Sequence, residues 1–247
     1  MLTEKFTNKG PAPEKATKRT IVITVDGPAA SGKGTLAKAI AKKLGFAHLD
    51  TGALYRAVAL ETLNAGGDPS SLEDVQKVLK GIKAKLTPEY LASPALRTRE
   101  VSDGAAKVAA LQEVRKAVRH YQTSFAQNPP GGEPGAVLDG RDIGTVVCPD
   151  ADVKLYIVAK AEERARRRFL ELKDRVEGLT LETVLDDINR RDANDMNRQH
   201  SPLKPADDAV TLDTTDLDRD GALEAALKIV ASKTKPPSGG KDRKPGV

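Results

Sequence analysis

The most constraining feature of the sequence is a glycine-rich stretch that joins a short apolar run to a helical pattern. Residues 21–25 are β-branched throughout, which is typical of a buried strand, and Asp26 and Gly27 end the run. From Leu36 onward, apolar residues recur at helical spacing until Gly45. A strand, a glycine-rich turn and a helix in this order predict the start of an α/β fold, with the turn at the carboxyl end of the strand.

The stretch itself matches the spacing of a P-loop, in which two glycines are followed by a lysine. Its backbone N–H groups would point inward at phosphate oxygens, and the N-terminus of the following helix would add to the attraction. Lys33 would reach the β- and γ-phosphates of a nucleotide, and Thr35 would help to position Mg²⁺. The alternative is a glycine-rich turn without a ligand, which the flanking strand and helix disfavour. The loop residues predicted to bind the nucleotide are Gly27, Pro28, Ala29, Ala30, Ser31, Gly32, Lys33, Gly34 and Thr35.

Strands and helices alternate along most of the chain. Further apolar strands are predicted at residues 46–49, 136–138, 153–158 and 209–212. The alternation predicts an α/β P-loop fold of three layers, with a mostly parallel five-stranded sheet covered on both faces. Hydrophobic residues make up 39% of the chain and aromatic residues only 3%, so we expect a core of Leu, Ile, Val and Ala.

Two helical segments interrupt this rhythm. Residues 65–130 contain helical patterns at 71–82 and 100–127, and we predict that they form an inserted subdomain. The charged helical runs at 162–176 and 181–198 would close over a site as a lid.

We place the whole domain at residues 20–233, with the insert at about 65–130 and the lid at about 162–198. The net charge is +5, but residues 1–20 carry +3 and residues 231–247 carry +4, so the remaining body is −2. Since a basic patch on the body is what nucleic-acid binding would require, we expect no nucleic acid as a partner.

The two ends of the chain are rich in Lys, Pro and Gly and poor in apolar residues. We predict that residues 1–19 and 234–247 are mobile tails, the second of them basic. The single cysteine, Cys148, excludes an internal disulfide framework, and no apolar run reaches the length of a membrane helix. We expect a cytoplasmic monomer that does not bind membranes.

Arginines recur on the faces of the two lid helices. Arg191, Asp195 and Arg198 follow the helical spacing i, i+4 and i+7. Arg164, Arg167 and Arg168 share a face of the preceding helix. A solvated charged face is the commoner outcome for such patterns. The three histidines, at positions 48, 120 and 200, share no spacing that indicates a metal site, and we predict no metal held by the protein alone.

The sequence resembles bacterial cytidylate kinases over nearly everything from Ile21 to about Leu227. The ending Lys-Gly-Thr of the P-loop is the variant typical of nucleoside-monophosphate kinases. Further matches follow in order along the chain, at residues 51–56, 96–98, 100–101, 107–111, 114–115, 139–147 and 191–198.

The resemblance implies an enzyme of pyrimidine nucleotide metabolism that transfers the γ-phosphoryl group of ATP to CMP, and to dCMP, with Mg²⁺. It implies catalytic roles for Lys33, Arg141, Arg191 and Arg198, and an ATP contact for Arg164. It implies substrate contacts for Thr51, Tyr55, Arg56, Arg115, Arg141, Asp142, Asp195 and Arg198. We expect Arg166, Arg167 and Arg168 to stay on a solvated face.

In this interpretation Arg56 and Arg141 bind the acceptor phosphate, and Asp195 accepts a hydrogen bond from the sugar. Asp142 and Arg115 would pair with the edge of cytosine, which carries an amine donor and two acceptors. Uracil replaces that donor by a carbonyl, so Asp142 would face it unpaired. The alternative for Asp142 is a loop aspartate that caps the turn after a strand.

Two positions depart from the family pattern. Ala106 stands where relatives commonly have a serine near the base, and residues 86–94 contain two prolines where the family often has a small sheet. Three alternative functions stay open. The first is a kinase for another monophosphate such as UMP, the second is a nucleic-acid-associated NTPase, and the third is a protein that binds phosphate without catalysis.

Overall fold

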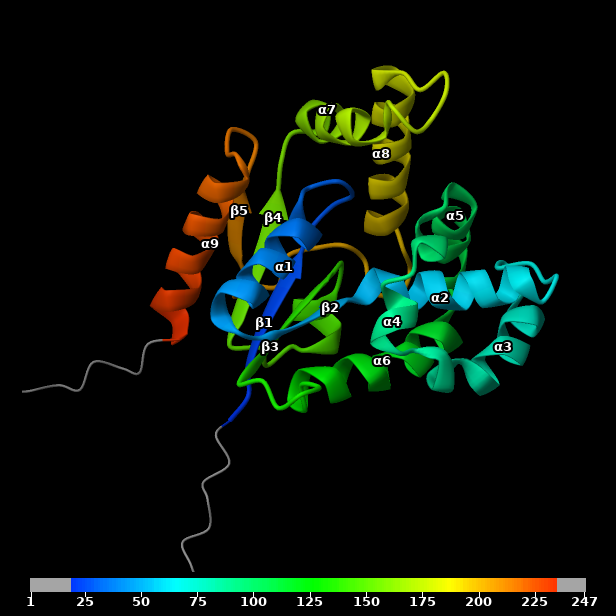
Figure 1. Ribbon diagram of the computed structural model, residues 1–247, viewed down its shortest axis with the longest axis horizontal. Helices are drawn as coiled ribbons and strands as arrows, with labels where there is room; N and C mark the ends of the chain where they lie inside the picture. Colours follow the sequence, from blue (N-terminus) through cyan, green and yellow to red (C-terminus); the bar gives the residue numbers. More distant parts are fainter. Residues whose placement is uncertain (1–18, 235–247) are drawn as a thin grey trace, which may run out of the picture.

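The computed structural model describes residues 19–234 (Figure 1). The tails predicted at 1–19 and 234–247 lie outside the described residues except for one residue each. Arg19 precedes the first strand, and Thr234 is the last residue of the last helix.

Five parallel strands form one sheet in the order β2-β3-β1-β4-β5. This confirms the predicted α/β fold with a five-stranded parallel sheet, although several strands begin or end one or two residues from the predicted positions. The register places Asp26 opposite Gly140, so the loops that follow β1 and β3 leave the sheet side by side. The strands are β1 (Ile21–Asp26), β2 (Ala47–Asp50), β3 (Gly135–Gly140), β4 (Val153–Val158) and β5 (Val210–Asp213).

Side chains alternate between the two faces of the sheet, and each face has its own helices. Ile23 and Val25 of β1 belong to the cluster that contains α1 and α9, whereas Ala136 and Leu138 of β3 belong to the cluster that contains α2 and α6. Apolar burial on both faces explains why the strands are near-continuous hydrophobic runs. The covering helices are α1 (Lys33–Leu44), α2 (Thr51–Asn64), α6 (Gln112–Gln127) and α9 (Arg219–Thr234).

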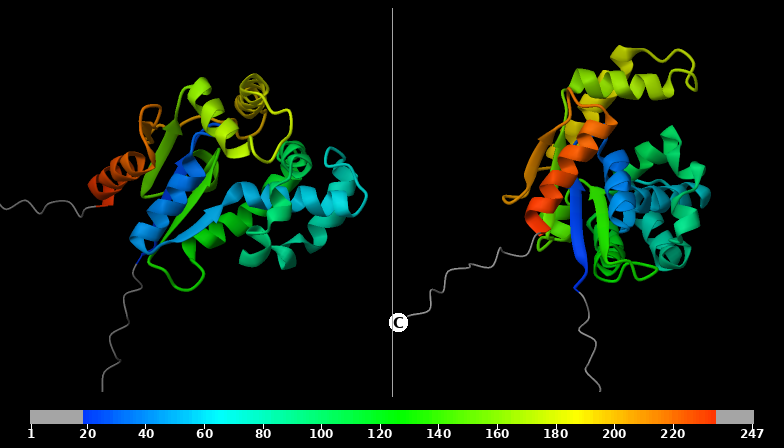
Figure 2. Two further views of the ribbon diagram at one scale, coloured as in Figure 1. Left: turned by 45° about the horizontal axis from the view of Figure 1, so that its top comes forward. Right: turned by 60° about the vertical axis from the view of Figure 1, so that its left-hand side comes forward.

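The insert is helical, as predicted, and forms a lobe beside the sheet (Figure 2). The single helical pattern predicted at 100–127 is wrong, because two helices meet at a break around Leu111. The first of them packs Gly104 closely against Ala59 of α2, while Val118 of the second faces the core next to the sheet, so the chain must turn between them. The other elements of the insert are α3 (Leu72–Lys85), α4 (Pro88–Leu91), η1 (Pro94–Arg97) and α5 (Arg99–Val108).

The lid is a hairpin of α7 (Ala161–Leu172) and α8 (Leu181–Met196) above the carboxyl ends of the strands (Figures 1 and 2). Both helices are shorter than predicted. Arg198 lies beyond the end of α8, so the expectation that it shares a helical face with Arg191 and Asp195 is wrong.

Between residues 19 and 234, no helix is long and apolar enough to cross a bilayer. A short π-helical turn, η2 (Ile143–Val147), follows β3 and leads to Cys148, which is free and partly buried. Burial raises the pKa of the Cys148 thiol to about 11, so the thiol is protonated at neutral pH.

Candidate active site

The loop between β1 and α1 has the close approaches and left-handed residues that a P-loop requires. A Cβ on Gly27 would lie 2.2 Å from the carbonyl oxygen of Ile157, so only glycine fits at the start of the loop. Gly32, at the end, has φ +81°, and α1 begins at the next residue. The backbone therefore curls at the positively polarised end of a helix, where anions bind.

Lys33, the first residue of α1, is buried next to this loop. Its ammonium group donates to the carbonyl oxygen of Pro28 at 3.1 Å. Burial and the nearby charge of Arg141 lower the pKa of Lys33 to about 7, although the carboxylates of Asp139 and Asp195 oppose this effect. The loop lysine thus lies within electrostatic reach of residues from β3 and from the lid.

Arg56, on the first turns of α2, pairs with Asp50 at the end of β2. Its Nη2 donates to Asp50 Oδ2 at 2.6 Å. Burial would raise the pKa of Asp50, but the Arg56 guanidinium outweighs it and holds this pKa below its usual value. Arg56 Nε is buried and has no acceptor among the described residues. A donor left free in this way is available to an anionic ligand.

A second group joins the loop after β3 to the end of the lid. Arg141 Nε donates to Asp195 Oδ2 at 2.7 Å, and Arg198 Nη2 lies 3.0 Å from Asp195 Oδ1. The contact of Arg198 lacks hydrogen-bond geometry, so its buried Nη2 is, like Arg56 Nε, a donor without an acceptor in the described chain. Burial lowers the pKa of Arg198. One carboxylate therefore faces two guanidinium groups, which leaves positive charge for a phosphate.

The predicted base-recognition pair is formed. Arg115 of α6 donates a hydrogen bond to Asp142; Asp142 is buried and Arg115 is partly buried. The guanidinium of Arg115 also lies 5.6 Å from the ring centre of Tyr55, in a cation–π contact. The turn that carries Asp142 is held by Asp26, whose carboxylate accepts hydrogen bonds from the N–H groups of Ile143 (3.0 Å) and Gly144 (2.8 Å).

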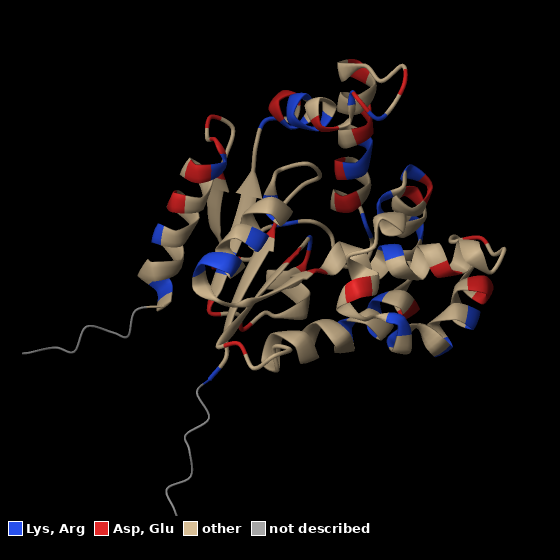
Figure 3. Ribbon diagram, in the orientation of Figure 1, with Lys and Arg blue, Asp and Glu red and all other residues tan. Residues whose placement is uncertain are grey.

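Three other residues predicted for the site, Thr51, Arg191 and Arg164, have surroundings unlike those of the arginine–carboxylate pairs. Thr51 donates its hydroxyl to the carbonyl oxygen of Asp139 at 2.7 Å, so it ties α2 to the end of β3. Arg191 is partly exposed on α8, 3.7 Å from Asp187, and Figure 3 shows that the lid helices carry both signs of charge. Arg164 is buried, and its Nε and Nη1 already donate to acceptors of the protein.

The expectation that Arg166, Arg167 and Arg168 stay on a solvated face holds only in part. Arg166 and Arg168 are exposed and pair with glutamates of their own helix. Arg167 contradicts the prediction of a solvated face, because its guanidinium donates to the carbonyl oxygens of Thr214 (2.6 Å) and Thr215 (3.1 Å). These carbonyls belong to the loop after β5, which turns back toward α7 and provides acceptors that helical spacing cannot reveal.

The sequence analysis did not identify the four aspartates that contact the arginines, the loop or the turn after β3. They are Asp26, Asp50, Asp139 and Asp192. Asp139 pairs with His48 at 2.8 Å and lies against Gly34, whose Cβ position would be 3.3 Å from Asp139 Oδ2. Asp26 and Asp50 end their strands and Asp139 is the last but one residue of β3. An aspartate at or next to the carboxyl end of a parallel strand is the signal that would have identified these three.

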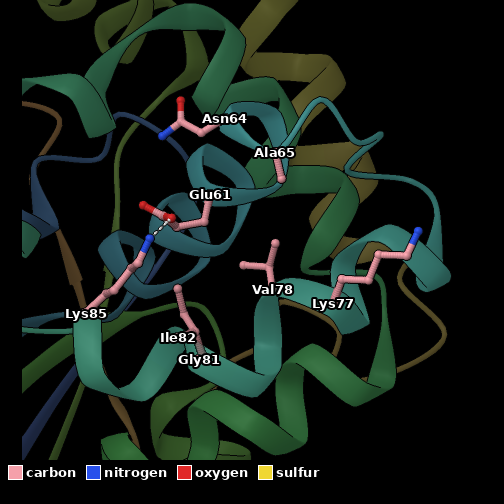
Figure 4. A pocket seen from close by; sticks show the side chains of 8 residues that line it. All are labelled: Glu61, Asn64, Ala65, Lys77, Val78, Gly81, Ile82 and Lys85. Carbon is pink, nitrogen blue, oxygen red and sulfur yellow. Dashed lines mark hydrogen bonds and ion pairs between the residues drawn. The ribbon is translucent and has the colours of Figure 1, made fainter.

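A separate hollow lies between α2 and α3, with a volume of about 430 Å³ (Figure 4). Its apolar floor includes Val78 and Ile82, and at one side Glu61 pairs with Lys85. None of the residues predicted to bind a nucleotide lines it. It belongs to the insert and not to the site around the loop.

Comparison with known proteins agrees with this arrangement. Residues 23–232 match the protein family described as Cytidylate kinase. The chain belongs to the cytidylate kinase family. Among its relatives, the cytidylate kinase of Paramagnetospirillum magneticum is 50% identical over 212 residues, which cover 86% of this chain and 98% of that protein.

Two further cytidylate kinases are similar to nearly the same degree. That of Rhodopseudomonas palustris is 50% identical and that of Bradyrhizobium diazoefficiens is 48% identical, each over 210 residues that cover 85% of this chain and 95% of the relative. The match to the cytidylate kinase family includes the loop, the insert and the lid, so the resemblance inferred from the sequence motifs is confirmed.

Proposed function

We propose that this chain transfers the γ-phosphoryl group of ATP to CMP, and to dCMP, and releases ADP with CDP or dCDP. The observation that carries the proposal is the pairing of Arg115 with Asp142 next to a cluster of arginines, opposite a P-loop. Family membership supports a kinase of this class.

On the donor side, backbone N–H groups of residues 29–35 and the ammonium group of Lys33 bind the phosphates of ATP. The charge-dispersed transition state needs positioning and neutralisation more than acid–base chemistry. Arg191 and Arg198 are assigned to the closure of the lid over both nucleotides, and Arg164 to the ATP side. Burial and the charge of Arg141 lower the pKa of Lys33, and the negative charge of a triphosphate beside it would oppose both effects and favour the charged ammonium form.

Mg²⁺ fits the oxygen donors of this site. The hydroxyl of Thr35 and the carboxylate of Asp139, which lies against Gly34, would hold the ion. When bound, the ion neutralises charge on the phosphates and orients them.

On the acceptor side, Arg56 and Arg141 bind the phosphate of CMP, Thr51 and Tyr55 line its site, and Asp195 accepts from the sugar hydroxyl. An ionised phosphate oxygen attacks the γ-phosphorus, the bond to the β–γ bridging oxygen breaks, and its electron pair leaves with ADP. The attacking oxygen carries no proton at neutral pH, so no general base is required.

Asp142 accepts from the amine of cytosine, and Arg115 donates to its acceptors. Because a carbonyl would face Asp142 in uracil, we infer that UMP is a poorer acceptor. We further propose that the protein acts as a monomer in the cytoplasm, where its nucleotide substrates occur. A body with net negative charge disfavours the alternative of a nucleic-acid-associated NTPase.

The test is to supply Mg²⁺ and ATP with each nucleoside monophosphate in turn and to measure the diphosphate formed. We expect CMP and dCMP to react fastest. Preference for UMP would assign the second candidate, a kinase for another monophosphate. Hydrolysis of ATP without transfer to any monophosphate would contradict the proposal.

A further inference from the structure

The lid is attached to the tip of the donor loop by a buried aspartate. Asp192 of α8 accepts a hydrogen bond from the N–H group of Ala29 at 2.8 Å through Oδ1. Its other oxygen, Oδ2, accepts from Arg164 Nη1 at 2.5 Å. These contacts join parts of the chain that are 163 and 28 residues apart.

Arg164 completes the attachment from α7. Its Nη1 also donates to the carbonyl oxygen of Ala29 at 2.8 Å, and its Nε donates to the carbonyl oxygen of Ala159 at 2.9 Å. Both polar backbone groups of Ala29 are therefore bound by one ion pair from the lid. The side chains of Arg164 and Asp192 are only 8% and 9% exposed, so the pair is shielded from water.

The next residue of the loop is held by apolar contacts. Ala30 packs against the small core of the lid hairpin, which contains Ala165, Val184 and Ile188. Ala30 has φ +56°, the left-handed conformation that a Cβ disfavours. Because the lid binds the residue before it and packs on its side chain, the lid stabilises this turn of the loop.

We propose that Asp192 is a positioning residue for the donor site, which with Arg164 holds the Ala29–Ala30 tip so that the following amides face the phosphates of ATP. The proposal rests on the proposed function for the identity of the donor. It gives Arg164 an indirect part in ATP binding.

The tip belongs to the donor loop alone, so loss of the pair should weaken ATP binding and leave CMP binding unchanged. The apparent dissociation constant rises in inverse proportion to the fraction of molecules whose loop is competent. A tip that holds its shape about a tenth of the time would therefore raise the constant about tenfold.

The experiment measures the dissociation constant of MgATP by calorimetry without an acceptor, and the KM for CMP at saturating ATP. Asp192→Ala is the direct variant, but it leaves Arg164 buried without its partner. The double variant Asp192→Leu with Arg164→Met removes both charges together and keeps apolar volume, which folded proteins often tolerate. Asp186→Asn, an exposed aspartate of the same helix, is the matched control.

We expect the double variant to bind MgATP about tenfold or more weakly, with a KM for CMP within about twofold of wild type. Amides of residues 29–32 should exchange with solvent faster in the variant than in the control. An unchanged dissociation constant in a folded double variant, or an equal rise in both constants, would overturn the proposal. Since ATP binding is measured without CMP, the dissociation constant still tests the role of Asp192 if CMP proves not to be the acceptor.

Discussion

The donor and acceptor sides of the proposed site present different groups to a phosphate. The donor side is one contiguous stretch, residues 27–35, whose backbone amides need no counter-ion. The acceptor side uses side chains from α2, α6, the loop after β3 and the end of the lid, and each arginine faces a carboxylate such as Asp50, Asp142 or Asp195.

This difference has a physical consequence. Neutral amides can stay in place in an empty loop, whereas several guanidinium groups brought together would repel one another unless carboxylates intervened. An acceptor phosphate would then compete with Asp50 and Asp195 for donors, although Arg56 Nε and Arg198 Nη2 have no hydrogen-bond acceptor between residues 19 and 234. Three substitutions test this difference between the donor and acceptor sides.

The largest effect is expected on the donor side, from Lys33→Ala. Loss of the one charge inside the amide loop should lower kcat by about a thousandfold or more, because it acts on charge that develops in the transition state. Steady-state kinetics with ATP and CMP measure the effect. Lys38→Ala, an exposed lysine of the same helix, is the control, and near-normal turnover of the Lys33 variant would contradict the phosphotransfer proposal.

Asp26 lies where the two sides meet, and Asp26→Asn tests that junction. Burial raises the pKa of Asp26 from 3.8 to about 6, although the N–H groups of Gly144 and Ile143 oppose this rise. The folded state therefore takes up a proton more readily than the unfolded chain, so wild type loses stability as the pH rises from about 4 to 7. An asparagine has no such ionisation.

The free energy of unfolding of Asp26→Asn, relative to wild type, should accordingly increase by about 2 to 3 kcal/mol between pH 4 and pH 7. Urea denaturation at the two pH values measures it. The same variant offers one acceptor oxygen to two N–H groups, so we expect a higher KM for CMP at neutral pH. A stability difference that does not change with pH would show that Asp26 is not buried as an ionisable group.

The smallest of the three effects concerns only the base. Asp142→Ala should lower the ratio of kcat/KM for CMP to that for UMP by about tenfold or more, because the carboxylate that rejects the uracil carbonyl is gone. Asp150→Ala, an exposed aspartate a few residues later, should leave the ratio unchanged. If the ratio stays at the wild-type value in the Asp142 variant, the base is recognised elsewhere.

Local patterns were enough to predict the parts of the fold in which neighbours in sequence are neighbours in space. The β-branched run of β1, the glycines of the loop and the spacing of Leu36 and Ile40 predicted a strand, a turn and a helix at their observed places. The same reasoning failed at residues 100–127, where apolar spacing continued across a break that packing against α2 imposes.

Partners in the site were harder to predict. Arg115 and Asp142 were paired through resemblance to the family, but Asp26 meets Gly144 across 118 residues and Asp192 meets Ala29 across 163. Such contacts leave no periodic trace in the sequence. The hydrogen bonds of Arg167 were not predicted for the same reason, because its acceptors are backbone carbonyls of a loop that is distant in sequence.

By itself, therefore, the sequence determined the fold class, the donor loop and the kind of chemistry, since these depend on spacing within a few residues. Only the tertiary structure decided which carboxylate neutralises which arginine, and that the lid holds the tip of the loop. The reason is that the parallel register brings the ends of β1, β2 and β3 to one edge of the sheet, and distances there follow from the order of strands and not from the order of residues.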